Sequence, residues 1–392
     1  MLRGHPWLFS GSISLAPHGA QPGDVIDLVD KDGRFVARGY FNPACDIAVR
    51  ILTLSDQEQI DKAFLRNRVQ AAIALRNNFI NREETNVYRL INAEGDFLPG
   101  LIADVFDRTI VVQSHTAGAD RLVSDLISVL KEEVKPEAIV LRNDASVRKR
   151  EGLKLEPPQV VLGSELLNEQ SPFVTVRENG LQFKVDPICG QKTGFFADQR
   201  DKRVLVKTVC GNLAPDAVLA NCFCYSAAFS IYAVSANSKL RTINIDESTR
   251  ALDLARESFT LNKLTTDNHE FIASDCFDWL EEQVKEKKQF QFIILDPPPF
   301  AKSHKDVKNA LKAYTRLNRL ALKCVAPGGY LLTCSCSGAI GLDDLEACLR
   351  TAAGEVERPV QMLEIFKHGA DHPTNVAAPE TQYLKALMCR VL

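Results

Sequence analysis

The second half of the chain alternates short apolar runs with stretches of helical periodicity, and this alternation constrains the fold most strongly. The apolar runs span 217–223, 241–245, 270–273, 291–295 and 329–334, and the helical stretches span 226–235, 248–262, 276–287, 307–325 and 342–353. Short apolar strands that alternate with helices are typical of a parallel sheet with helices on both faces. We therefore predict a doubly wound α/β domain that ends in two late strands, at 362–366 and 383–391.

The chain before this region shows the patterns of two smaller units. Three β runs at 24–30, 34–40 and 46–53 are followed by a predicted helix over 56–79, and an Asp-Gly turn joins the first two runs. The residues from 85 to 183 have the mixed pattern of an α+β unit, with a hairpin around Glu-Asn-Gly near its end. Because 392 residues exceed one usual domain, we predict three domains, at 1–75, 76–183 and 184–392.

Charge and cysteine content limit the classes of function. The chain has 47 Lys and Arg against 50 Asp and Glu, so any binding of nucleic acid must use a local basic patch. The eleven cysteines are odd in number and lie mostly in apolar stretches, which predicts a reducing, cytoplasmic location. The most apolar long stretch, 218–234, is too short and too interrupted for a membrane helix, so we expect no membrane association.

Polar or acidic residues follow all five predicted parallel strands, at the edge where doubly wound sheets bind ligands. These residues are Asn221 to Ser226, Asp246, Asp275, Asp296 and Ser335 to Gly338. A carboxylate such as Asp246 suits a ribose diol, and the absence of a G-x-G-x-x-G turn argues against NAD and FAD. The pattern favours an adenosine ligand without phosphates, such as S-adenosylmethionine, although Asp275 taken alone has the alternative role of a helix N-cap.

The sharpest local signal is Asp296-Pro297-Pro298-Pro299-Phe300, directly after an apolar strand. The prolines hold the backbone extended, the Asp296 carboxylate can accept from the amino group of a planar base, and Phe300 offers a stacking surface. A strand that merely ends in a stiff loop is the structural alternative.

A second signal, Thr333-Cys334-Ser335-Cys336-Ser337-Gly338, places a thiol in a polar loop at the same edge, where it can act as a nucleophile. Carbon 5 of cytosine becomes enamine-like only after a thiolate has attacked carbon 6, and this chemistry needs one cysteine and one acid near the base. The pairs Cys222-x-Cys224 and Cys334-x-Cys336 could instead form a zinc site, but zinc pairs usually have the spacing C-x-x-C. We therefore expect no metal.

A basic stretch, 142–150, follows a strand of the middle unit and contains Arg142, Arg148 and Lys149. It is a candidate for contacts with the backbone phosphates of a nucleic acid. A solvated, charged loop is an equally good interpretation.

Several motifs extend these observations over nearly the whole chain. They are His5-Pro6-Trp7-Leu8-Phe9-Ser10-Gly11, Leu141-Arg142-Asn143-Asp144, Val147-Arg148-Lys149, Gln191 to Arg200, Asp296 to Phe300, Ser335 to Gly338, Asp371-His372-Pro373 and Tyr383-Leu384-Lys385. Together they resemble the ribosomal-RNA large-subunit methyltransferase I family, class I S-adenosylmethionine enzymes that make 5-methylcytosine. The resemblance implies an N-terminal PUA β-barrel that binds RNA, a small α+β middle domain and a C-terminal Rossmann-like methyltransferase domain.

The resemblance also implies roles for particular residues. Cys336 would attack carbon 6 of a cytosine flipped out of its stack in large-subunit ribosomal RNA, and Asp296 would hold that base. The residues implied for the cofactor are Asp198, Arg200, Asn221, Phe223, Tyr225, Ser226, Asp246, Asp275 and Asp296, and those for RNA are Arg142, Arg148, Lys149, Lys192 and Phe300. A homodimer is a further expectation.

Two other functions stay open. Asp-Pro-Pro-Pro-Phe also resembles the loop of amino-directed methyltransferases, which transfer a methyl group to an exocyclic amine and would not need Cys336. Ala227 and Ala228 stand where the family has glycines, and each added methyl group takes room near the cofactor. A decayed enzyme that serves as an RNA-binding or assembly factor is therefore the third hypothesis.

Overall fold

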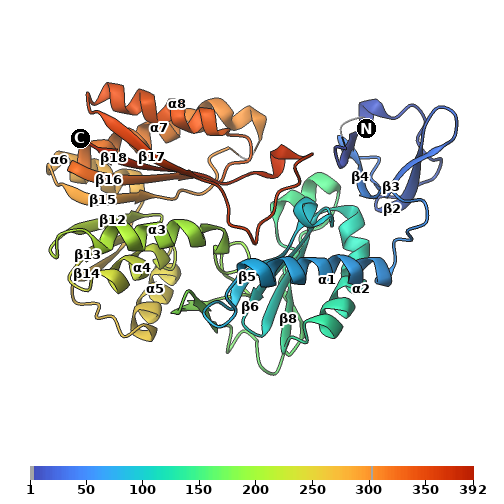
Figure 1. The fold of residues 1–392 in the computed structure, drawn as a ribbon, viewed down its shortest axis with the longest axis horizontal. Helices are drawn as coiled ribbons and strands as arrows, with labels where there is room; N and C mark the ends of the chain where they lie inside the picture. Colours follow the sequence, from blue (N-terminus) through green and yellow to red (C-terminus); the bar gives the residue numbers. More distant parts are fainter. Residues whose placement is uncertain (1–3, 302) are drawn as a thin grey trace. The chain divides into compact units, whose positions relative to one another are not determined.

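The computed structural model describes residues 4–301 and 303–392, and the chain forms two compact units (Figure 1). The first unit contains the chain up to Asn179 together with Val185–Ala197 and Ala370–Thr381. The second contains Gly180–Lys184, Asp198–Gly369 and Gln382–Leu392. Two segments that follow the first unit in sequence therefore return to it.

The N-terminal part of the first unit is a four-stranded antiparallel sheet in the order β1-β4-β3-β2. Its strands are β1 (Trp7–Phe9), β2 (Asp24–Val29), β3 (Phe35–Phe41) and β4 (Ile47–Thr53), and η1 (Ser10–Ser12) follows the first. The three predicted strands are confirmed. In β2 the burial alternates along the strand, as expected where one face packs and the other is solvated.

The second sheet of this unit has five strands in the order β5-β6-β7-β8-β9. The strands are β5 (Val87–Asn92), β6 (Leu101–Phe106), β7 (Thr109–Ser114), β8 (Ala138–Leu141) and β9 (Gln159–Leu162), with η2 (Ala93–Asp96) and η3 (Ser146–Glu151) between them. Leu65 and Val69 of α1 (Lys62–Phe79) and Leu126 of α2 (Ala117–Glu133) are buried in one core with this sheet. The helix predicted over 56–79 begins later, because the Asp61 carboxylate caps it by accepting from the Phe64 N–H at 2.9 Å.

The second unit is built on a seven-stranded sheet in the order β14-β13-β12-β15-β16-β18-β17. The strands are β12 (Val218–Cys222), β13 (Arg241–Asp246), β14 (His269–Ala273), β15 (Phe290–Leu295), β16 (Val325–Ser335), β17 (Val360–Phe366) and β18 (Lys385–Val391). The five predicted parallel strands are confirmed, and β18 alone among the seven strands of this sheet runs antiparallel to the others. β10 (Val174–Glu178) and β11 (Leu181–Val185) form the predicted hairpin.

Helices cover both faces of the large sheet (Figure 1). The helices of this unit are α3 (Arg200–Gly211), α4 (Ala228–Ala236), α5 (Thr249–Leu261), α6 (Cys276–Lys285), α7 (Val307–Cys324) and α8 (Leu342–Glu355). Side chains of α6, α7 and α8 share one apolar core with the sheet, and those of α3 and α4 share another. The short η4 (Ala197–Gln199), η5 (His304–Asp306) and η6 (Pro379–Thr381) lie in connections. The fold confirms the predicted Rossmann-like architecture, whereas α3 had no counterpart in the sequence prediction.

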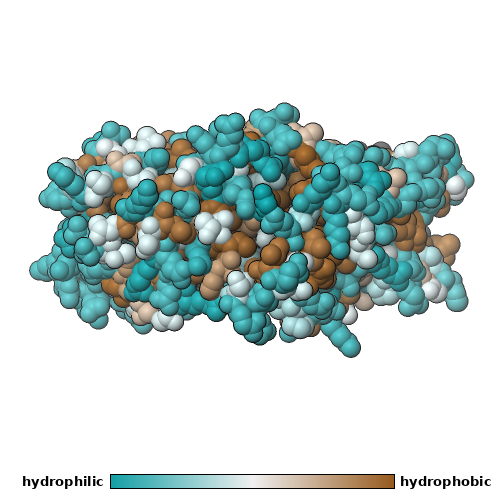
Figure 2. Space-filling model, turned by 90° about the horizontal axis from the view of Figure 1, so that it is seen from below, coloured by the Kyte–Doolittle hydropathy of each residue, from teal (hydrophilic) through white to brown (hydrophobic). Residues whose placement is uncertain are grey.

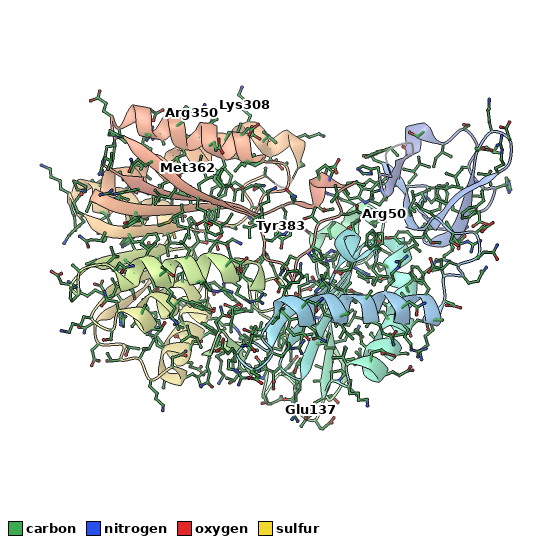
Figure 3. The ribbon with its side chains drawn as sticks, viewed as in Figure 1. Arg50, Glu137, Lys308, Arg350, Met362 and Tyr383 are labelled. Carbon is green, nitrogen blue, oxygen red and sulfur yellow. The ribbon has the colours of Figure 1, made fainter. Side chains whose placement is uncertain are left out.

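The two late strands pair antiparallel with each other, joined by a long connection between Phe366 and Lys385. β18 lies between β16 and β17 and pairs with both, with Ser335 opposite Lys385 in the register. β17 is the edge strand, on which Met362 is exposed (Figure 3). Because β18 inserts beside β16, it delivers its first residues to the carboxyl end of that strand.

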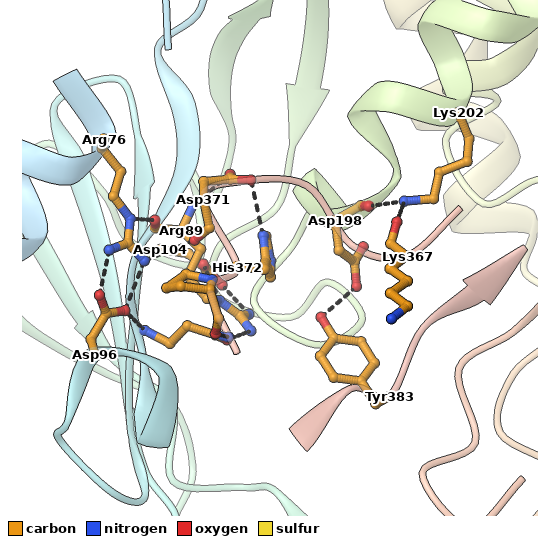
Figure 4. A network of polar contacts seen from close by, with 12 residues as sticks. Arg76, Arg89, Asp96, Asp104, Asp198, Lys202, Lys367, Asp371, His372 and Tyr383 are labelled. Carbon is orange, nitrogen blue, oxygen red and sulfur yellow. Dashed lines mark hydrogen bonds and ion pairs between the residues drawn. The ribbon is translucent and has the colours of Figure 1, made fainter. Parts of the chain in front are cut away.

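Buried arginines anchor the returning segments within the first unit (Figure 4). Arg76 binds Asp96 through two N–H···O contacts and donates to the Asp371 carbonyl at 2.8 Å. Arg89 binds both oxygens of Asp104, which also accepts from Thr193 at 2.6 Å. Replacing one partner of such a pair would leave the other charge buried and uncompensated, so either substitution would strongly destabilise the fold.

Hydrophilic side chains cover most of the face shown in Figure 2, with apolar side chains scattered between them. Within residues 4–301 and 303–392, no helix combines the length and apolar composition that crossing a bilayer requires. No disulfide connects the eleven cysteines, all of which are free thiols.

Gly118, in the first turn of α2, is predicted to be essential for packing. A Cβ atom at this position would lie 1.9 Å from Cγ of Tyr40, a buried ring whose hydroxyl donates to the Pro99 carbonyl at 2.7 Å. We expect Gly118→Ala to lower the free energy of unfolding by about 2 kcal/mol, the cost of forcing an extra methyl group into a packed core. Urea denaturation measures the change.

The matched control is Gly354→Ala in α8, where an added Cβ would meet no atom within 4 Å. Alanine replaces glycine there without a clash, so stability should rise by about 0.5–1 kcal/mol. Equal stability of Gly118→Ala and the wild type would contradict the assigned packing.

Candidate active site

The carboxyl ends of the parallel strands gather the predicted residues at one edge of the large sheet. Cys222 of β12 is opposite Ile245 and Leu295, and Leu295 is opposite Thr333. The residues that follow these positions therefore meet along one edge: the 223–227 loop, Asp246, Asp296 and Cys336. In a doubly wound sheet this edge is where a ligand binds.

Asp246, the last residue of β13, is held by two main-chain donors. Its Oδ2 accepts from the Tyr225 N–H and its Oδ1 from the Ser248 N–H, each at 2.9 Å. A carboxylate oxygen can accept more than one hydrogen bond. The oriented carboxylate can thus accept the two hydroxyl groups of a ribose as well.

The loop after β12 has an unusual backbone. Phe223, Tyr225 and Ala227 all have positive φ, at 59°, 47° and 53°. The Cys224 N–H donates to Ile245 and the Ala227 N–H donates to Cys224, so the loop is tied to β13 and closes a turn before α4. L-residues adopt this left-handed conformation at a cost of roughly 1–2 kcal/mol each.

This backbone refines the expectation about the two alanines. Ala227 occupies a left-handed position at the N-cap of α4, where glycine would be free of strain, whereas Ala228 is an ordinary first helical residue. Ala227 thus carries a conformational cost that Ala228 does not.

Asn221 belongs to a fully buried polar chain. Its Nδ2 donates to Ser230 Oγ at 3.0 Å, and that hydroxyl donates to Asn244 at 2.6 Å. Its Oδ1 is buried and finds no hydrogen-bond partner among the residues that the structure describes. The side-chain amide is therefore held in place through Nδ2, while Oδ1 can still accept a hydrogen bond.

Asp296, directly after β15, is oriented by a residue to which the sequence analysis gave no role. Gln199 Nε2 donates to Asp296 Oδ1 at 2.9 Å, while Gln199 Oε1 is buried without a partner among residues 4–301 and 303–392. The only sequence signal for Gln199 was its place in the Gln191 to Arg200 motif.

Cys336 and the proline loop lie together. The Cys336 thiol, half-buried, donates to the Pro297 carbonyl at 3.6 Å. Cys334 is fully buried in the apolar core, and burial holds the pKa of its thiol well above the ordinary value. Of the two adjacent thiols, only Cys336 is open to a ligand.

Phe300 is less free than the sequence prediction assumed. Its ring packs against Tyr314 at 4.8 Å and Phe277 at 5.9 Å between centroids, and the side chain is half-buried. The Tyr314 hydroxyl shares hydrogen bonds with Ser335 and Ser337, and burial raises the pKa of this tyrosine to about 12. Phe300 therefore braces the loop that carries Asp296.

The remaining cofactor candidates have internal partners. Asp198 accepts from the Tyr383 hydroxyl at 2.7 Å through Oδ2 and from Lys202 at 2.6 Å through its carbonyl (Figure 4). Arg200 begins α3 and is buried. Asp275 is the N-cap of α6, because its Oδ1 accepts from the Asp278 N–H at 2.9 Å, so the alternative role is the one seen here.

Comparisons with known proteins agree with this geometry. Residues 1–54 match the PUA-like domain family, and residues 163–390 match the S-adenosylmethionine-dependent methyltransferase family. The chain is 38% identical, over its whole length and 96% of the relative, to the ribosomal RNA large subunit methyltransferase I of Erwinia tasmaniensis, and 37% identical to that of Yersinia pestis, with the same coverage.

The chain belongs to the ribosomal RNA large subunit methyltransferase I family. Two solved structures share the fold: a methyltransferase complexed with SAH, with a TM-score of 0.84, and a methyltransferase from Streptococcus mutans, with 0.83. Each is 20% identical and covers 99% of this chain and 96% of its own. As the family match indicates, this protein is a methyltransferase that uses S-adenosylmethionine.

The site of this methyltransferase fits its cofactor. Asp246 can accept hydrogen bonds from the ribose hydroxyls, and Asn221 Oδ1 is a buried acceptor without a partner among the described residues. The 223–227 loop brings main-chain atoms to the same edge. Among the described residues, no group of three or more His, Cys, Asp or Glu could hold a metal ion, so the four thiols of the zinc alternative are not gathered there.

Two of the predicted RNA contacts need correction. Arg142 is buried and binds Asp144 at 2.8 Å and the Gly190 carbonyl at 3.1 Å. Arg148 is also buried, and it donates to Ser114 and to Asp120 at 2.7 Å. These guanidinium groups hold the first unit together, so neither is presented to an RNA phosphate.

The other two basic candidates are accessible. Lys149 is exposed on η3, and Lys192 is exposed with its ammonium 4.4 Å from the centroid of the Phe196 ring. The basic stretch therefore offers fewer accessible charges than its sequence suggests.

We expect Ala227→Gly and Ala228→Gly to have opposite effects. Glycine at 227 relieves a left-handed φ, so the free energy of unfolding should rise by up to about 1 kcal/mol. Glycine at 228 weakens the start of α4 and should cost about 0.5–1 kcal/mol. Urea denaturation compares the two variants with the wild type, and a loss of stability in both would refute the assigned loop conformation.

Proposed function

We propose that this methyltransferase forms 5-methylcytosine in large-subunit ribosomal RNA and uses Cys336 as a covalent nucleophile. The observation that carries the proposal is the half-exposed Cys336 thiol at the proline loop, whose first residue is the oriented Asp296. The names of the curated relatives support the RNA substrate.

The covalent route accounts for all electrons and protons. The Cys336 thiolate attacks carbon 6, so an S–C bond forms and the electrons of the 5,6 double bond become available at carbon 5. S-adenosylmethionine would supply an electrophilic methyl group for that carbon, the electrons of the broken S–CH3 bond would stay on sulfur, and S-adenosylhomocysteine would leave. A base, for which water suffices, then removes the proton from carbon 5. The released electron pair restores the double bond and expels the thiolate.

Asp296 would hold the cytosine in this reaction. The carboxylate, kept in place by Gln199, can accept a hydrogen bond from the exocyclic amino group of the base. The target base must leave its stack to reach Cys336, as in other enzymes that modify bases. Phe300 supports this loop through its contact with Tyr314.

We assign RNA binding to the PUA-like sheet and to the exposed lysines Lys149 and Lys192. The separate four- and five-stranded sheets of the first unit support two domains ahead of the methyltransferase domain, and because α1 packs with the second sheet, the boundary between them would precede Lys62 rather than follow residue 75. The eleven free thiols support a reducing, cytoplasmic location.

Replacement of Cys336 tests the mechanism. We expect Cys336→Ala to lower methyl transfer to undermethylated ribosomal RNA by about 10³-fold or more, because a catalytic nucleophile acts as a unit with its partners. Incorporation of tritium from labelled cofactor measures the loss. Cys334→Ala is the matched control, since it removes the neighbouring thiol, which is buried, and should retain most activity.

RNA that carries 5-fluorocytosine at the target adds a direct readout. Fluorine replaces the proton that must leave carbon 5, so wild-type protein should accumulate a covalent complex that Cys336→Ala cannot form. Full activity in Cys336→Ala, with the methyl group on the amino nitrogen by nucleoside mass spectrometry, would favour the amino-directed alternative. A lack of S-adenosylmethionine binding by calorimetry would favour the decayed assembly factor.

Lys149→Ala should weaken RNA binding through the loss of one phosphate contact. The slope of log affinity against log salt concentration should fall in magnitude by about 1. Fluorescence anisotropy with labelled RNA measures this slope, and Lys239→Ala, an exposed lysine outside the proposed RNA surface, serves as the control. An unchanged slope for Lys149→Ala would exclude the contact.

A further inference from the structure

We propose that the ammonium group of Lys385 is a positioning and activating group that favours the thiolate form of Cys336. This inference rests on the proposed function for its meaning in catalysis, but the charge and position of Lys385 can be tested without RNA. Nothing in the sequence analysis gave this lysine a role beyond the Tyr383-Leu384-Lys385 motif.

The sheet places Lys385 beside the nucleophile. Lys385 is the first residue of β18, and its register partner on β16 is Ser335, the residue before Cys336. Its Nζ donates to the carbonyl of Ser337, the residue after Cys336, at 2.8 Å. The lysine thus contacts or pairs with the main chain on both sides of the cysteine.

The ammonium is fixed by neutral partners. It donates to the Ser337 and Tyr383 carbonyls, the latter at 2.9 Å, and it forms no ion pair with any described carboxylate. Only 5% of Lys385 is exposed. An ammonium ion has three donors, and two of them are used by these carbonyls. Because carbonyls are neutral, the positive charge has no counter-ion in contact.

A buried, uncompensated cation is costly unless an anion forms nearby. Burial lowers the pKa of Lys385 to about 8, and a negative charge on Cys336, and to a lesser degree Asp344, raises it. The attraction is mutual, so the ammonium that is stabilised by a thiolate also stabilises that thiolate. Lys385 would therefore help to form the nucleophile and would also hold the loop that carries it.

The ionisable groups described around this pair come from several elements. Tyr314 approaches from α7 and stays neutral, because its pKa is about 12. Asp344 comes from α8, Asp296 follows β15, and Cys334 precedes on β16. Asp296 and Asp344 are acidic, so among these groups only Lys385 favours the thiolate by its charge.

The test separates charge from hydrogen bonding. Lys385→Gln keeps an N–H donor for the carbonyls and removes the charge, whereas Lys385→Arg keeps the charge. The rate of iodoacetamide alkylation at Cys336 is followed from pH 6 to 10 by mass spectrometry that assigns the modified cysteine. The full chain without RNA is used, and calorimetry with S-adenosylmethionine confirms that each variant is folded.

We expect Lys385→Gln to raise the midpoint pH of alkylation by about one pH unit, the usual effect of an adjacent charge. Lys385→Arg should restore most of the wild-type curve. Below pH 8 the wild type should react several-fold faster than Lys385→Gln, and the two rates should converge above pH 8 as Lys385 loses its proton. Lys202→Gln is the matched control. Lys202 is also buried and donates to main-chain carbonyls, but the thiol with which its charge interacts is Cys334, so the Cys336 midpoint should not move.

An unchanged midpoint in Lys385→Gln would overturn the proposal, and so would equal shifts in Lys385→Gln and Lys385→Arg, which would show a purely structural role. If the midpoint moves as expected while Cys336→Ala still methylates RNA, then Lys385 activates the thiol but the covalent mechanism is wrong. The two proposals can therefore fail separately.

Discussion

The pairing of β18 with β16 is the interaction on which the second unit depends. Six register pairs join the two strands, from Tyr330 and Arg390 to Ser335 and Lys385. This antiparallel insertion completes the apolar cores through buried residues of β18 such as Leu387 and Met388. It also aligns the end of β16 with the start of β18, so the segment that carries Cys336 is supported by a main-chain ladder rather than by a loose loop.

The same insertion explains the path of the chain between β17 and β18. The chain leaves the second unit after β17, contributes Ala370–Thr381 to the first unit and returns to begin β18. Within the first unit, the buried Arg76 guanidinium donates to the Asp371 carbonyl, and the Arg89 main-chain N–H donates to the Asp371 carboxylate. The Asp371-His372-Pro373 motif therefore anchors this segment in the first unit.

The sequence predicted the parallel strands and their polar ends because apolar runs and following acids are local patterns. It could not predict α3, β18 between β16 and β17, or the Gln199–Asp296 contact, since these depend on residues far apart in the chain. The roles of Asp275 and Phe300 also needed the structure. A carboxylate that caps a helix and one that binds a ligand look alike in sequence, as do a ring that stacks on a base and one that packs on Tyr314.

The distribution of basic residues decides how this protein can recognise RNA. Arginines counted from the sequence overstate the available positive charge, because Arg50, Arg142 and Arg148 are committed to internal ion pairs with Glu151, Asp144 and Asp120. The net charge of the chain is −3, so no general positive field attracts phosphates. Long-range attraction is weak and screened by salt under these conditions. Under the proposed function, selection of the target would therefore rest on the shape of the RNA against the PUA-like domain and on capture of a single unstacked base beside Asp296 and Cys336.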